Sequence, residues 1–249
     1  MAILDEVVSL DEVPQGKLVV VYGKSSSGKT QFGSTFPKPM LYVKIGDDGA
    51  NTIKAAKGVD AIEASSPNRL KALLKELKSD TKYKTVFLDT FSLMVNEWKD
   101  ENVFKKKKKM TQQLWGDLLQ DTEELVRLAH ELSLDKWVIL SGHEVMDSIE
   151  GMEDELLPDV RMAVSKGART YLEGMANYGL HTVKIQKEVE SPEGTKTIIK
   201  YAMDIGPNPF YWTKLQVDPS VKVPKRIINP TYKKLIEVIE KESNNEKEA

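Results

Sequence analysis

The chain has 249 residues, which is enough for one domain with a large hydrophobic core. Lys and Arg number 36 against 38 Asp and Glu, a formal net charge of −2, so any nucleic-acid binding must depend on a local basic patch. There is no cysteine, which excludes disulfides, thiolate metal sites and cysteine nucleophiles.

Hydrophobic residues make up 40% of the chain, but no apolar run approaches the roughly 18 residues of a membrane span. The first residues include Asp5 and Glu6 where a signal peptide has a basic start. We therefore expect a cytoplasmic protein with no membrane partner.

The first predicted strand, at residues 17–22, leads directly into a phosphate-binding motif. Residues 23–30 (GKSSSGKT) match the GxxxxGK[ST] pattern of a P-loop, in which glycines let the backbone approach phosphate oxygens. Lys29 would reach the β- and γ-phosphates, and Thr30 would ligate Mg²⁺. The alternative is a Gly/Ser-rich turn that matches by chance. The predicted nucleotide-binding residues are Gly23, Lys24, Ser25, Ser26, Ser27, Gly28, Lys29, Thr30 and Gln31.

Two further predicted strands end in acidic residues. The strand at residues 40–45 runs into Asp47 and Asp48, which could polarise a water for attack on the γ-phosphate or could form an ordinary Asp/Gly turn. The strand at residues 84–90 carries the acid Asp89 near its end. Asp89 resembles a Walker B acid that reaches Mg²⁺, although Asp also starts ordinary turns.

A run of five lysines follows a predicted helix over residues 91–100. Consecutive like charges repel one another, so the run predicts an exposed loop. It could contact the phosphate backbone of a nucleic acid, or it could be a solvated linker. The candidate DNA-binding lysines are Lys105, Lys106, Lys107, Lys108 and Lys109.

Residues 111–132 carry the longest helical pattern, and Trp115 beside its leucine stripe is expected in the core, the alternative being a base-stacking residue. A strand at residues 136–141 precedes His143, which is either a sensor of the γ-phosphate or a structural histidine. Residues 145–170 are predicted as a loop, followed by a helix through residues 171–175. The basic residues of that loop are Arg161, Lys166 and Arg169.

The remaining chain has a different pattern. Residues 178–188 and 195–205 are predicted as extended segments joined by a turn at residues 191–194, and a final amphipathic helix follows Pro230. Residues 240–249 are charged and are expected to be a flexible acidic tail. We expect one domain over residues 1–249, with residues 1–16 as a lead-in.

Strands that alternate with helices predict an α/β fold with a mostly parallel central sheet flanked by helices and a C-terminal β-hairpin extension. The chain resembles the RecA-like P-loop ATPases, and within them the single-domain phage nucleotide-binding proteins, or AAA-type ATPases, related to RecA and UvsX. The resemblance is carried by GKSSSGKT at residues 23–30, VFLDT at 86–90, LSGHE at 140–144 and PKRIINPTYKKLIEVI at 224–239.

The resemblance implies hydrolysis of ATP with Mg²⁺, coupled to single-stranded DNA in annealing or strand exchange during phage recombination in the host cytoplasm. It implies that Asp47 or Asp48 activates water, where RecA has Glu. It implies DNA contacts from residues 105–109 and 145–170. It also implies a homo-oligomer, ring or filament, in which a basic residue of a neighbouring subunit completes the site. The candidates for that residue are Lys214, Lys225 and Arg226.

A single-stranded-DNA-binding protein is the natural partner from the resemblance. Two other functions remain open at this point. One is a RecA-fold DNA helicase or helicase loader, and the other is a nucleotide-gated DNA-binding protein with little hydrolysis.

Overall fold

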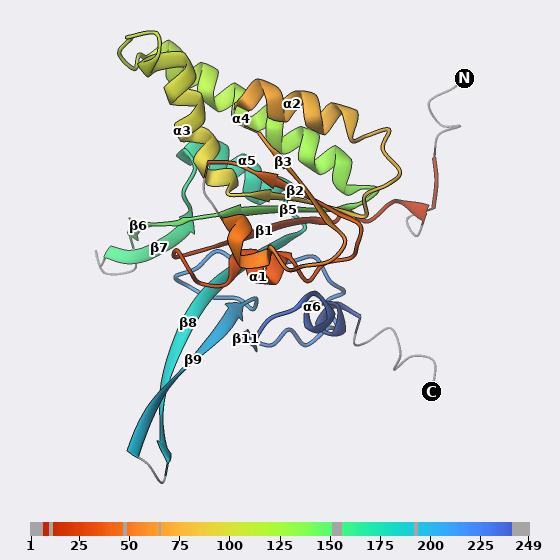
Figure 1. The fold of residues 1–249 in the computed structure, drawn as a ribbon, viewed down its shortest axis with the longest axis vertical. Coiled ribbons are helices and arrows are strands. Elements are labelled where there is room, and N and C mark those ends of the chain that lie inside the picture. The colour runs from red at the N-terminus through yellow and green to blue at the C-terminus, as the bar shows by residue number, and fades with distance from the viewer. Residues whose placement is uncertain are drawn as a thin grey trace.

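The computed structural model describes residues 7–9, 12–46, 49–64, 66–150, 156–191 and 194–240. Its centre is a sheet with the strand order β11–β9–β8–β1–β5–β4–β2–β3, and β10 pairs with β8 (Figure 1). The strands of this sheet are β1 (Leu18–Gly23), β2 (Met40–Lys44), β3 (Val59–Glu63), β4 (Thr85–Asp89), β5 (Trp137–Gly142), β8 (Tyr178–Ser191), β9 (Gly194–Asp204), β10 (Lys214–Leu215) and β11 (Arg226–Ile228).

The strands from β3 across to β8 all run parallel, whereas β9, β10 and β11 pair antiparallel. The predicted α/β fold with a mostly parallel sheet is therefore confirmed. Strand β1 is central, with β5 on one side and β8 on the other, and all six of its residues are buried. A strand covered on both faces needs apolar side chains at every position, which explains the continuous run LVVVY.

Helices cover both faces of the sheet (Figure 1). On one face lie α2 (Pro67–Glu76), α3 (Met94–Lys99), α4 (Gln112–Ser133) and α5 (Lys166–Met175). On the other lie α1 (Lys29–Gly33) and α6 (Tyr232–Ile239). Successive residues of β1 point to opposite faces of the sheet. Val20 packs in a cluster with Leu74 and Leu125, and Val21 packs in a cluster with Phe32 and Leu235.

The N-terminal end of α4 packs against α3 through a small cluster of Trp98, Val103 and Leu118. Trp98 is only 3% exposed, whereas Trp115 is 47% exposed. The expectation that Trp115 lies in the core is therefore wrong. Trp115 is one residue beyond Leu114, which packs on this cluster, and a step of about 100° per residue on an α-helix turns it outward.

Residues 145–170 are not the predicted loop. They contain β6 (Glu144–Glu150) and β7 (Leu156–Met162), an antiparallel pair, and α5 begins at Lys166. Pro158 pairs with Ser148 in this two-stranded ribbon, although a proline usually argues against a strand. Val160, two residues further along β7, directs its N–H to Phe210 O outside the ribbon, so the missing N–H of Pro158 lies on the same outer side and removes no bond from the β6–β7 ladder.

Strand β8 leaves the central sheet part-way along its length. It pairs with β1 through residues 178–182 and with β9 from the His181–Asp204 pair to the Ser191–Gly194 pair. The outer part of β8 and β9 therefore projects from the body of the molecule as a two-stranded arm (Figure 1). Beyond residue 240, the predicted acidic tail lies outside the described residues. Within the described part of the chain, no helix is both long and apolar enough to cross a bilayer.

Candidate nucleotide-binding site

The loop between β1 and α1 has a backbone that only glycine suits at its two ends. Gly23 and Gly28 have φ of 155° and 95°, values that L side chains rarely adopt. A Cβ at Gly23 would also lie 2.3 Å from the carbonyl oxygen of Thr182 on β8. The two glycines of the GxxxxGK motif therefore let the loop leave β1, pass close to β8 and enter α1.

Lys29 is buried across this loop. Its Nζ donates to the carbonyl oxygens of Gly23 at 2.9 Å and Lys24 at 2.8 Å. These bonds hold the ammonium at the wall of the cavity that the loop encloses. An ammonium held there is suited to binding phosphate oxygens.

Asp89, at the end of β4, is the polar centre of the site and is 2% exposed. Its Oδ2 accepts from Thr30 Oγ1 at 2.7 Å and from Tyr42 OH at 3.0 Å. Its Oδ1 accepts from Thr90 Oγ1 at 3.1 Å and also from Ser141 Oγ. These donors satisfy the buried carboxylate and fix its orientation toward Thr30.

The sheet register explains why these donors meet. Lys44 of β2 pairs with Asp89 of β4, and β5 follows on the other side of β4. Parallel strands end at the same edge of a sheet, and that edge carries the ligand site in α/β proteins. Side chains from β2, β4 and β5 therefore surround Asp89 beside the P-loop.

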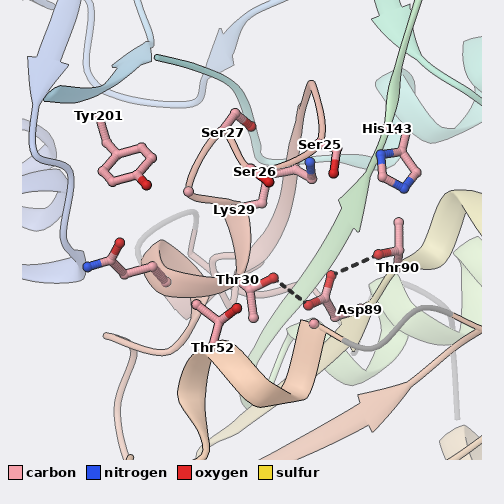
Figure 2. Close-up of a pocket in the computed structure, with 13 residues that line it drawn as sticks. Ser25, Ser26, Ser27, Lys29, Thr30, Thr52, Asp89, Thr90, His143 and Tyr201 are labelled. Carbon is pink, nitrogen blue, oxygen red and sulfur yellow. Dashed lines mark hydrogen bonds between the residues drawn. The ribbon is translucent and has the colours of Figure 1, made fainter. Parts of the chain in front are cut away.

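A cavity of about 380 Å³ runs over the P-loop. Figure 2 shows Tyr201, from β9, at one end of the cavity and His143, after β5, at the other, with Lys29 between them. The residues that line it are Ser25, Ser26, Ser27, Gly28, Lys29, Thr30, Gln31, Gly49, Thr52, Asp89, Thr90, His143 and Tyr201.

A smaller cavity of about 150 Å³ continues from the Tyr201 end, because Gly28, Gln31 and Tyr201 line both cavities. A Cβ at Gly28 would lie 3.0 Å from Cδ1 of Tyr201, so the tyrosine ring packs closely on the P-loop. The smaller cavity is otherwise lined by Phe32, Thr35, Asn229, Pro230 and Thr231.

Thr30 and Asp89 fit a magnesium ion by their chemistry, since Mg²⁺ prefers hydroxyl and carboxylate oxygens. The space beside them depends on a glycine: a Cβ at Gly49 would lie 2.8 Å from Asp89 Oδ2 and 3.1 Å from Thr30 Oγ1. Within the described ranges, no group of three or more His, Asp and Glu side chains could hold a metal.

A family model for an AAA domain matches residues 15–217. The chain belongs to this family. The match supports an AAA-type P-loop ATPase, with nucleotide binding and the Mg²⁺ that typically accompanies it. No curated protein matches the chain.

Of the other predicted site residues of this AAA-family chain, His143 lines the cavity. Asp47 and Asp48 are outside the described residues, but Gly49 next to them lines the cavity. The backbone N–H of His143 donates to Ser92 Oγ at 3.0 Å, which fixes the turn that presents the imidazole. Sequence reasoning missed Tyr201, Thr52 and the segment at 229–231, because they reach the cavity only through long-range packing.

The five lysines at residues 105–109 are exposed and do not line the nucleotide cavity. They follow α3 and a π-helical turn, Asp100–Phe104. Figure 1 shows the C-terminal end of α3, which leads to the lysines, far from α1.

The basic residues of the β6–β7 region are mostly paired. Arg161 Nε lies 2.5 Å from Asp159 Oδ1, and Arg169 Nη1 lies 2.6 Å from Asp147 Oδ2. Lys166, at the start of α5, is exposed. Carboxylates of the same chain therefore neutralise the charges of both arginines.

The three candidates for a residue acting on a neighbouring subunit differ in their surroundings. Lys214 Nζ donates to the carbonyl oxygens of Glu173 and Gly174 at 3.0 and 2.9 Å, near the end of α5, and burial lowers the pKa of its ammonium. Arg226 forms two hydrogen bonds with Asp204, at 2.6 and 3.0 Å. Lys225 is exposed.

Proposed function

We propose that this protein is a RecA-like ATPase that binds single-stranded DNA and acts in annealing or strand exchange during phage recombination. The arrangement of Lys29, Thr30 and Asp89 around one cavity carries the ATPase part. The exposed lysines at residues 105–109 support the DNA part, and the phage setting rests on the sequence resemblance alone.

In this proposal, the ATP lies along the cavity with its phosphates toward Asp89 and His143 and its base toward Tyr201. Lys29 and the loop amides bind the phosphates, and Thr30 with Asp89 would hold Mg²⁺. When bound, Mg²⁺ would neutralise charge that develops on the phosphate oxygens. Asp47 or Asp48 would orient the attacking water, and His143 would respond to the γ-phosphate.

The smaller cavity supports this orientation. It is lined by Phe32, Pro230 and the Tyr201 ring, which suit a planar base better than a phosphate. The segment at residues 229–231 would contact the edge of the base, and this segment belongs to the stretch that carries the family resemblance.

We also propose that a second copy of the chain completes the site. Lys225 is exposed next to β11 and could reach a neighbour, whereas Lys214 is engaged by the carbonyls near the end of α5 and Arg226 by Asp204. A ring or filament of copies would then place a basic residue against the transferred phosphate.

The deciding experiment is ATP turnover with and without single-stranded DNA, with Lys29→Ala as the control. Turnover that DNA stimulates, and that the variant lacks, supports a DNA-coupled ATPase. Bound ATP without turnover or stimulation would contradict the coupled ATPase and favour a nucleotide-gated binding protein. Strand displacement of a short duplex would instead favour a helicase.

A further inference from the structure

Two aromatic side chains lie exposed next to the lysine run in sequence. Phe104 immediately precedes the run and is 66% exposed, and Trp115 follows it in the first turn of α4 and is 47% exposed. Burying a large apolar side chain is worth about 1.5–3 kcal/mol, and neither of these rings gains that stabilisation in full.

The ring of Trp115 is positioned without being buried. The Nζ of Lys99, at the end of α3, lies 4.8 Å from the centre of the ring, a cation–π contact. Thr111 accepts a hydrogen bond from Leu114 N and caps the helix on which Trp115 sits. A hydrogen bond from Trp98 on α3 to Asp121 Oδ2 on α4, 2.5 Å long, holds these two helices together.

Cations accompany each ring: the lysine run directly follows Phe104 in the sequence, and Lys99 lies over Trp115. Lys105 pairs with Asp100 at 2.9 Å, but both side chains are at least half exposed, and an ion pair in water is weak. Lys106 Nζ donates to Asn102 Oδ1, a neutral amide, so its charge is retained. A surface of this kind combines cations for phosphates with aromatic faces for bases.

We propose that Trp115 and Phe104 form a stacking site for the bases of a single-stranded nucleic acid, while Lys99 and residues 105–109 contact its phosphates. This proposal rests on the DNA-binding part of the proposed function and assigns it to particular rings. A single strand fits better than a duplex, because its bases are free to stack on protein side chains. Stacking tolerates any sequence, since every base has a π-face.

The test is the affinity of the full chain for a fluorescently labelled dT oligonucleotide of about 20 residues, measured by anisotropy at several salt concentrations. Trp115→Ala should weaken binding about fivefold or more. Its salt dependence should stay unchanged, because no cation is removed. Replacing the five lysines should instead flatten the salt dependence. Trp115→Phe, which keeps a ring, should retain most of the affinity.

Leu134→Ala is the matched control, because Leu134 is an apolar residue at the other end of α4 that is 45% exposed. Circular dichroism and ATP binding verify that each variant is folded. The same titration with an rU oligonucleotide distinguishes RNA from DNA as the ligand. Quenching of tryptophan fluorescence by the oligonucleotide should fall in Trp115→Phe.

The outcomes separate the two proposals. If the wild-type chain binds the oligonucleotides and Trp115→Ala behaves like Leu134→Ala, the stacking site is wrong and the proposed DNA binding stands. If the wild-type chain binds neither oligonucleotide, both are wrong. A loss of affinity in Trp115→Ala and in Phe104→Ala, with Leu134→Ala unchanged, supports the stacking site.

Discussion

The hydroxyl of Ser27 in the P-loop lies 2.7 Å from the hydroxyl of Thr182 on β8. Thr182 donates its own proton to the carbonyl oxygen of Tyr22 at 3.1 Å, so Ser27 is the donor between the two hydroxyls. Both side chains are buried. This bond joins the nucleotide-binding loop to β8, the strand that continues beyond the central sheet into the projecting arm.

We expect Thr182→Val to destabilise the protein and weaken nucleotide binding. Valine has a similar shape but no acceptor, so the buried Ser27 hydroxyl loses its bond at a cost of about 1–3 kcal/mol. For a chain of this size the melting temperature should fall by about 2–12 °C. Thermal unfolding and titration with a fluorescent ATP analogue test this. Thr182→Ser restores the acceptor and should behave like the wild type; equal loss in both variants would contradict the role of the hydroxyl.

Gly49→Ala should raise the Mg²⁺ concentration needed for ATP turnover. The added Cβ would lie 2.8 Å from Asp89 Oδ2, a carboxylate that its hydroxyl donors hold in place. Displacing groups that orient a metal ligand commonly costs about 10–100-fold in metal affinity. The measurement is turnover against Mg²⁺ concentration, and a wild-type midpoint would contradict this account of the site.

Gly116→Ala is the matched control for that substitution. A Cβ at Gly116 meets nothing within 4 Å, and the residue lies inside α4. Alanine favours a helix over glycine by about 0.5–1 kcal/mol, so the melting temperature should rise by about 1–4 °C. The Mg²⁺ midpoint should not change.

Tyr201→Ala should separate binding of the base from binding of the phosphates. Loss of an aromatic ring that stacks on a base weakens binding by about fivefold or more, whereas inorganic tripolyphosphate, which has no base, should compete as well as it does with the wild type. Tyr201→Phe keeps the ring and should bind ATP nearly normally. Competition titrations measure both ligands. Equal weakening of ATP and tripolyphosphate would indicate damage to the P-loop instead.

The ion pair of Arg226 with Asp204 should make stability depend on pH. Burial by itself raises the pKa of Asp204, but hydrogen bonds from His181 and Arg226 outweigh it, so the pKa lies below its usual value. His181 in turn lies 2.8 Å from Glu144, which links this cluster to β6. A carboxyl with a lowered pKa stabilises the fold above the pKa of the unfolded chain, about 3.9, and loses that contribution as the pH falls through the folded value.

Arg226→Gln should therefore lower the melting temperature near pH 7 by about 2–4 °C, corresponding to roughly 1 kcal/mol for a pair partly screened by water. The difference from the wild type should shrink toward zero as the pH falls through the lowered pKa of Asp204 and the carboxyl becomes protonated. Lys225→Gln removes the same charge from the adjacent exposed residue and should change little. A difference that stays constant from pH 7 to pH 2 would contradict the ion-pair explanation.

The sequence by itself determined the parallel sheet, the P-loop and the buried strand that ends at Asp89. These features are contiguous in the chain: LVVVY followed by GKSSSGKT, and VFLD ending at Asp89. Apolar runs indicate strands that are buried on both faces of the sheet, and the glycines indicate a backbone conformation that does not depend on a distant partner. Such signals are local, so they can be interpreted without knowing which elements lie side by side.

The tertiary structure alone brought Tyr201 onto Gly28 and placed Gly49 against Asp89. It also paired β6 with β7 and turned Trp115 outward. Each of these depends on which distant segment occupies the neighbouring space. Periodicity in a sequence shows that a face will be covered, but long-range packing decides what covers it and which ring stays in water.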